Sequence, residues 1–211
     1  MRKSFVKEIK ELHRKVRPRI SARLSEFRSL WQTGAEEKIF HELVFCLLTP
    51  QSNAKSCWSI VEDLKEKDLL FSAGERQLAD MFNRTRFRNN KARYVCEARG
   101  KFKTLRSCLE SFNDPFEARE WLVKNVKGYG YKEASHFLRN IGLGKDIAIL
   151  DRHILKNLKG AGVISHIPKS ISRKVYLDIE RRMKKLSNKI GIPLDHLDLL
   201  LWYKEAGEVF K

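Results

Sequence analysis

Two glycines, Gly128 and Gly130, stand between two stretches of helical spacing and therefore require a tight turn at that point. Upstream, Asp114-Pro115-Phe116-Glu117 has the pattern of a helix start, with an acidic capping residue and proline at the first helical position. Downstream, apolar residues recur with the i, i+3, i+4, i+7 spacing of one helix face: Ala134, Phe137, Leu138 and Ile141. The sequence therefore predicts a helix, a glycine hairpin and a second helix.

The rest of the chain also carries helical spacing. An opening helix meets Pro18, where proline removes a backbone hydrogen bond and breaks or kinks a helix, and the pattern resumes from Ile20. Ser72-Ala73-Gly74-Glu75 has the pattern of a capping box, and further apolar stripes begin at Ile39, Ile171 and Leu194. Because strand-like alternation is nearly absent, we expect an all-α fold.

The glycine hairpin has a chemical use as well as a geometric one. Glycine accepts positive φ and lets another group approach the backbone closely. The first N–H groups of the following helix lack partners within the helix and lie at the positive end of its dipole, so they suit an anion such as a phosphate. A glycine pair between helices is also often only a tight connection.

Charge indicates what kind of partner the chain has. It contains 43 Lys and Arg against 26 Asp and Glu, a formal net charge of +17 in 211 residues. Such an excess favours nucleic acid, although ribosome assembly or an anionic membrane surface would also suit it. We find no membrane-spanning segment and no signal peptide. The four cysteines are widely spaced, as expected for reduced thiols in the cytoplasm.

Lys132 lies in the first turn of the second predicted helix, where a cation opposes the helix dipole. The same field favours the neutral amine, which is the form that attacks carbon. Asp151 precedes another predicted helix and suits an N-cap, with Leu150 and Leu155 spaced as a hydrophobic staple. Each residue has a structural explanation alone; the two together around a hairpin indicate chemistry on a nucleotide.

The segment VKGYGYKEASHFLRNIG, followed by LDRHIL, resembles the helix-hairpin-helix, Gly/Pro-rich, Asp superfamily of DNA glycosylases. A lysine at position 132 marks the branch that also cleaves abasic sites, and the closest likeness is to type-2 8-oxoguanine DNA glycosylases. The resemblance covers essentially the whole chain. It departs from the superfamily label in one respect, because no proline lies between the hairpin and Asp151.

The resemblance implies two helical lobes with an active-site cleft between them. Residues 34–146 would form a helical barrel that ends with the hairpin, and residues 1–33 and 147–211 would form the second lobe. It also implies that Lys132 is the nucleophile and that Asp151 faces it across the cleft.

The same resemblance sets expectations for partners and cofactors. The chain would act as a monomer on double-stranded DNA containing 8-oxoguanine, in the cytoplasm and at the nucleoid of a prokaryote. No metal or organic cofactor is expected, and no iron–sulfur cluster, because the C-terminal third lacks the cysteines that some relatives use. The carbonyl groups of Val126 and Gly128 could hold a monovalent cation beside a phosphate, as in relatives.

A basic patch runs from Asn83 to Arg93, in which five of eleven residues are basic and Phe87 is the single aromatic. Enzymes that act on a base in a duplex must extrude it, and an apolar side chain can fill the space. Phe87 is our candidate for this wedge, with Arg86 or Arg88 bonding the orphaned partner base. Alternatively, the patch is a solvated loop whose aromatic ring returns to the core.

Thr49-Pro50-Gln51-Ser52-Asn53 is a polar segment between two apolar helices. In the superfamily the equivalent turn lines the cleft. Gln51 and Asn53 are therefore further candidates for DNA contact.

The C-terminal segment supplies candidates for a base pocket. 8-Oxoguanine carries an N7–H donor that guanine lacks, so a selective pocket should place an acceptor there. The terminal carboxylate of Lys211 is such an acceptor, and a terminal lysine is a feature of the type-2 family. Trp202 could stack on the base and Asp198 could bond its Watson–Crick edge; the alternatives are a core aromatic and a surface carboxylate.

Two other functions share parts of this pattern. A glycosylase/lyase for oxidised pyrimidines, of the endonuclease III type, would share the hairpin and both catalytic residues. A non-enzymatic helix-hairpin-helix DNA-binding protein would explain the charge and the turn but would give Lys132 and Asp151 no reason to occur together.

Overall fold

The computed structural model describes residues 2–211, and these are helical throughout, with no β-strand. The predicted all-α fold is confirmed. Short 3-10 helices at Phe82–Arg84 and Phe102–Thr104 supplement the α-helices. The α-helices are α1 (Lys3–Thr33), α2 (Glu36–Leu48), α3 (Ala54–Glu66), α4 (Glu75–Met81), α5 (Arg88–Arg99), α6 (Leu105–Glu110), α7 (Pro115–Asn125), α8 (Tyr131–Asn140), α9 (Arg152–Gly160), α10 (Arg173–Ile190) and α11 (Leu194–Ala206).

The chain divides into two compact units. Unit 2 is Leu30–Phe137, and unit 1 combines the segment up to Ser29 with Leu138–Lys211. The expected lobe boundaries lay instead between residues 33 and 34 and between residues 146 and 147. The end of α8 and the following loop group with α1 because Gly142 meets the α1 backbone: a Cβ on Gly142 would lie 2.6 Å from Arg28 Cα.

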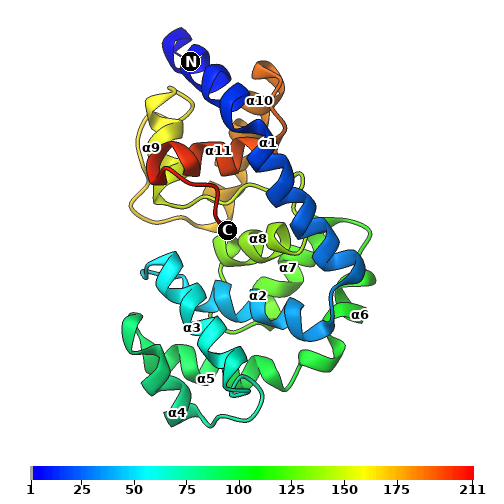
Figure 1. The fold of residues 1–211 in the computed structure, drawn as a ribbon. Helices are drawn as coiled ribbons and strands as arrows, with labels where there is room; N and C mark the ends of the chain where they lie inside the picture. Colours follow the sequence, from blue (N-terminus) through cyan, green and yellow to red (C-terminus); the bar gives the residue numbers. More distant parts are fainter. Residues whose placement is uncertain (1) are drawn as a thin grey trace. The chain divides into compact units, whose positions relative to one another are not determined.

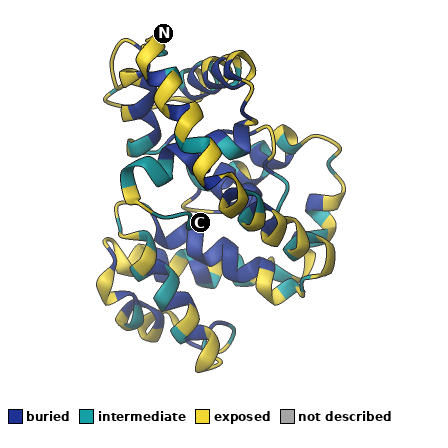
Figure 2. Cartoon of the chain, turned by 45° about the horizontal axis from the view of Figure 1, so that its top comes forward, coloured by how far each residue is buried: buried dark blue, intermediate teal, exposed yellow. Residues whose placement is uncertain are grey.

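Unit 2 is built around α2. Residues 39–48 of this helix are all buried, whereas the outer helices present an exposed side as well (Figure 2). Helices α3 and α5 both pack against α2 (Figure 1). α2 ends at Leu48, and its C-cap is Thr49, the first residue of the polar segment that the sequence singled out.

Unit 1 is built around α11, which packs against α9 and α10. An apolar stripe of α1 belongs to the same core: Phe5, Ile9, Val16, Ile20, Leu24 and Phe27. No helix within residues 2–211 is long and apolar enough to cross a membrane.

Two local predictions were wrong. α1 continues through Pro18 without a break (Figure 1). Pro18 lies on the exposed side, where water can satisfy the carbonyl group that loses its partner. The predicted capping box at Ser72 does not form either: the Ser72 hydroxyl donates to the Asp68 carbonyl oxygen at 2.7 Å, and Gly74 caps α4.

The predicted cap of α7 is confirmed. The Asp114 carboxylate accepts a hydrogen bond from the Phe116 N–H at 2.8 Å, and Pro115 occupies the first helical position. α7 and α8 therefore flank the glycine hairpin as the sequence predicted.

Candidate active site

The hairpin Val126–Gly130 connects α7 to α8 in unit 2. Gly128 has φ of +90°, and a Cβ there would lie 2.5 Å from a ring carbon of Tyr94. The Tyr129 N–H donates to the Val126 carbonyl oxygen at 3.1 Å and closes the turn. Only glycine fits position 128, for both conformational and steric reasons.

Gly130 serves a different purpose from the one expected. Its φ is not positive, and its N–H donates to the Glu133 carboxylate at 3.1 Å. Glu133 occupies the third position of α8, so this is the reach-back half of a capping box. A phosphate would therefore compete with Glu133 for this amide. Within the hairpin, the Val126 carbonyl that could contribute to a cation site is also engaged by Tyr129.

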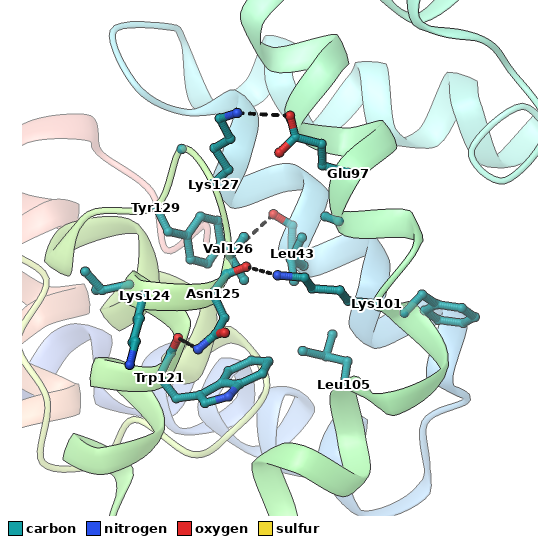
Figure 3. Close-up of a pocket in the computed structure, with 14 residues that line it drawn as sticks. Leu43, Glu97, Lys101, Leu105, Trp121, Lys124, Asn125, Val126, Lys127 and Tyr129 are labelled. Carbon is teal, nitrogen blue, oxygen red and sulfur yellow. Dashed lines mark hydrogen bonds and ion pairs between the residues drawn. The ribbon is translucent and has the colours of Figure 1, made fainter.

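The hairpin is anchored to the core of unit 2. The buried Tyr129 hydroxyl donates to the Leu43 carbonyl oxygen of α2 at 2.9 Å, and burial holds the pKa of this phenol well above its usual range. Residues 126–129 form one wall of a pocket of about 510 Å³ (Figure 3). Around it, Lys101 Nζ donates to the Asn125 carbonyl oxygen at 2.7 Å (Figure 3).

Lys132 lies in the first turn of α8, with its side chain 24% exposed. Its amine donates to the Thr49 hydroxyl oxygen at 3.1 Å. The Glu133 carboxylate is 3.8 Å from the same amine. The amine is thus held by one hydroxyl and remains partly accessible, as a nucleophile requires.

Lys91, from α5, lies close to this site and is only 3% exposed. Its ammonium group donates to the carbonyl oxygens of Leu48 and Pro50, at 2.7 and 3.0 Å, and to the Ser52 hydroxyl at 2.9 Å. Burial, helped by the nearby Lys132 amine and opposed by Cys57 and Glu133, lowers the pKa of Lys91 to about 8.

Phe87 does not return to the core. Its side chain is 53% exposed, and its backbone has the left-handed conformation, with φ of 59°, at the start of α5. The Arg86 guanidinium lies 5.3 Å from the ring centroid. The patch is not a single loop, because α5 begins at Arg88, and of its basic residues Lys91 is buried.

The remaining DNA-contact candidates of unit 2 are also exposed. Gln51 has left-handed φ of 53°, and Arg88 opens α5. Asn53 caps α3, accepting from the Ser56 N–H at 3.1 Å. Its side-chain NH₂ group stays available for another acceptor.

Asp151 belongs to unit 1 and caps α9, as the sequence predicted. Its Oδ1 accepts from the Ile154 N–H at 2.8 Å. This bond fixes the direction of the carboxylate and leaves the second oxygen for another partner.

Asp198 is buried rather than on the surface. Its Oδ2 accepts from the Arg139 guanidinium at 3.0 Å, and both side chains are at most 5% exposed. Burial raises the pKa of Asp198 to about 7, opposed by Arg139 and increased by the nearby Asp151 carboxylate. Among the described residues, Oδ1 of Asp198 has no hydrogen-bond partner.

The C-terminal residues fold back along α11. Gly207 ends the helix in the left-handed conformation, with φ of 78°. The Phe210 ring then lies 6.3 Å from the Trp202 ring, tilted by 33°. Trp202 and Lys211 both keep part of their surface exposed. Neither of the two is a fully buried core residue.

Sequence reasoning missed four residues around these candidates: Thr49, Lys91, Glu133 and Arg139. Glu133 could have been found from its spacing three residues after Gly130. The other three are joined to their partners by contacts between distant parts of the chain, so no local pattern marks them.

The sequence profile of the Ogg-HhH family, described as 8-oxoguanine DNA glycosylase, matches residues 20–192. The chain belongs to the 8-oxoguanine DNA glycosylase family. The 8-oxoguanine DNA glycosylase/AP lyase of Fusobacterium nucleatum is 43% identical to it over 98% of each chain.

Two solved structures of family members have similar folds. The 8-oxoguanine DNA glycosylase of Thermotoga maritima matches with a TM-score of 0.90 at 35% identity over 99% of both chains. The Methanocaldococcus jannaschii 8-oxoguanine glycosylase/lyase, in complex with 15mer DNA containing 8-oxoguanine, matches with a TM-score of 0.90 at 37% identity. The match covers 98% of this chain and 99% of the Methanocaldococcus jannaschii chain.

Proposed function

We propose that this chain is a bifunctional DNA repair enzyme that excises 8-oxoguanine from double-stranded DNA and then cuts the strand as an AP lyase. The observation that carries the proposal is a partly accessible amine, Lys132, at the head of the helix that follows the hairpin, in a chain that belongs to this family. A non-enzymatic binder would have no use for a nucleophile held in this way.

Lys132 is the nucleophile of the proposed reaction. Its neutral amine attacks C1′ of the damaged nucleotide, and the C1′–N9 bond breaks with its electron pair leaving on the base, which takes up a proton. Opening of the sugar gives a Schiff base between Lys132 and C1′. Loss of a C2′ proton then expels the 3′ phosphate by β-elimination, which cuts the strand.

Asp151 stabilises the positive charge that develops on the sugar as the base departs. Its second role, as the cap of α9, fixes the direction of the carboxylate. The two roles can be separated, because asparagine also caps helices well but carries no charge.

The remaining candidates of unit 2 bind the DNA and help to extrude the damaged nucleotide. The hairpin residues Gly128 and Gly130 approach a backbone phosphate. Phe87 fills the space of the extruded nucleotide, beside Arg86 and Arg88. The turn residues Gln51 and Asn53 contribute lesser contacts.

The base pocket is the C-terminal segment of unit 1. Trp202 stacks on the extruded base, Asp198 bonds its Watson–Crick edge, and the terminal carboxylate of Lys211 accepts the N7–H. The chain works as a monomer on the chromosome in a prokaryotic cytoplasm. It needs no metal or organic cofactor, so excision should continue in EDTA.

Borohydride trapping tests the proposal. Wild-type protein, incubated with a duplex containing 8-oxoguanine and reduced in place, should form a covalent adduct with the DNA. Lys132→Gln should abolish the adduct and keep DNA binding, and Asp151→Asn should slow excision at least about 100-fold without loss of stability.

Lys145→Gln is the matched control, because it removes the same charge at an exposed position outside the proposed site. It should form the adduct at the wild-type rate. An undiminished adduct with Lys132→Gln would refute the assigned nucleophile, and faster excision of thymine glycol than of 8-oxoguanine would refute the assigned substrate.

A further inference from the structure

The turn between α2 and α3, residues 48–52, is held by three separate elements of unit 2. Lys91 reaches it from α5, and Lys132 reaches it from α8. The backbone N–H of Arg86 also donates to the Ser52 hydroxyl, at 3.1 Å. We call these residues the 48–52 turn.

Lys91 holds the 48–52 turn at points on either side of Thr49. Its ammonium group bonds the carbonyl oxygens of Leu48 and Pro50, the residues before and after Thr49. With the bond to Ser52, all three of its protons are used. The backbone is therefore held in place on both sides of Thr49.

The Thr49 hydroxyl is fixed in direction as well as in position. It donates its one proton to the Cys46 carbonyl oxygen at 3.0 Å, so its oxygen faces the Lys132 amine as an acceptor, at 3.1 Å. Thr49 itself is 7% exposed, so water does not compete freely for this contact. The Glu133 carboxylate lies farther from the amine, at 3.8 Å, so the Thr49 hydroxyl is the group within hydrogen-bond distance that directs it.

Ser52 extends the same network to the basic patch. It accepts from both Lys91 and the Arg86 N–H, and Arg86 directly precedes the exposed Phe87. The proposed wedge and the proposed nucleophile are thus both tied to the 48–52 turn.

We infer that Lys91 is a positioning residue: it clamps the 48–52 turn so that Thr49 aims the Lys132 amine, and through Ser52 it ties that amine to the backbone beside Phe87. This inference rests on the proposed function, because it takes Lys132 as the nucleophile.

Single-turnover rates on two duplexes test the inference. An 8-oxoguanine duplex requires base extrusion and attack, whereas a duplex with an abasic site requires attack without extrusion of a damaged base. Lys91→Met and Thr49→Val should each slow both reactions about 10- to 100-fold, because the amine is misplaced, while DNA affinity stays unchanged.

Two further variants serve as controls. Thr49→Ser keeps the hydroxyl and should restore most of the rate. Arg99→Met removes another α5 side chain that bonds a backbone carbonyl, that of Ala73 at 3.0 Å, and should leave both rates unchanged. If Lys91→Met does not unfold cooperatively, Ser52→Ala takes its place, because it removes one of the three acceptors; both rates should again fall.

The outcomes separate the two proposals. Wild-type rates for Lys91→Met on the abasic duplex, in a protein that forms the borohydride adduct normally, overturn the inference alone. Slower reaction on the 8-oxoguanine duplex only also overturns it, since the defect would then lie in extrusion. A wild-type protein that forms no adduct with either duplex overturns the proposed function and the inference together.

Discussion

Each unit has a buried cation beside a proposed catalytic residue, but the two units compensate its charge differently. In unit 1, Arg139 bonds the carboxylate of Asp198, close to Asp151. In unit 2, Lys91 bonds two carbonyl oxygens and a hydroxyl, close to Lys132. A buried charge is costly unless its partners compensate it, and carbonyl groups compensate it without adding an opposite charge.

The two arrangements place different charges around the neighbouring proposed catalytic residue. A carboxylate beside Lys91 would form an ion pair and would also attract the Lys132 ammonium. Carbonyl partners hold the Lys91 ammonium group without adding another carboxylate near Lys132, whose amine already has the Glu133 carboxylate at 3.8 Å. In unit 1, by contrast, the Asp198 carboxylate supplies an opposite charge directly to Arg139.

The largest effect should come from breaking the ion pair. Arg139→Met leaves the Asp198 carboxylate buried without its cation, so the free energy of unfolding should fall by about 3–5 kcal/mol. Urea unfolding at pH 8, where Asp198 is ionised, measures it. A loss no larger than that of an ordinary surface substitution would show that the Asp198 carboxylate does not depend on Arg139 for charge compensation.

Lys91→Met should cost less stability than Arg139→Met. It removes three hydrogen bonds but leaves no uncompensated charge, and each acceptor keeps another donor: the Cys57 thiol for Leu48, the Ser52 hydroxyl for Pro50 and the Arg86 N–H for Ser52. We therefore expect a loss of about 1–3 kcal/mol. The same urea experiment, with both variants run in parallel, gives the order. A larger loss of stability for Lys91→Met than for Arg139→Met would contradict the idea that the ion pair is the more costly of the two to break.

The pH dependence of stability should single out Asp198. Its native pKa, about 7, is above its ordinary value, 3.8, so the native state holds this proton longer than the unfolded state. The stability gained from the neutral carboxyl is full below about pH 4 and is lost as the pH rises through 7. Asp198→Asn has no such proton, so the midpoint temperature of wild type relative to Asp198→Asn should fall between pH 5 and 8. A constant difference would contradict the assignment.

The smallest effect concerns the hairpin anchor in unit 2. Tyr129→Phe removes one neutral hydrogen bond to the Leu43 carbonyl oxygen and should reduce the free energy of unfolding by about 1 kcal/mol. Because Gly128 still fixes the turn, the borohydride adduct should form nearly as fast as in wild type. A large loss of adduct would show that the anchor, and not the 48–52 turn, positions Lys132.

Sequence patterns correctly predicted the features that depend on residues close together in the chain. The hairpin, the caps at Asp114 and Asp151 and the helical content could all be inferred, because each depends on residues within one or two turns. Pro18 misled the prediction because its effect depends on which side of α1 faces water.

The surroundings of the site could not be predicted in the same way. Lys91 lies in the same basic segment as several exposed arginines, and nothing in the sequence distinguishes it from them. Only the packing of α5 against α2 buries its side chain. Similarly, Arg139 and Asp198 are separated by most of unit 1 along the chain, and nothing in either segment signals the partner.

The discontinuity of unit 1 has a consequence during synthesis. Residues 30–137 emerge from the ribosome as one uninterrupted stretch and can collapse around α2 while translation continues. The first part of α1 must wait, with its apolar stripe uncovered, until residues 138–211 of the same unit have been made. The nascent chain therefore has an interval in which this stripe is open to chaperones or to unwanted association, and a faster-translated C-terminal half would shorten it.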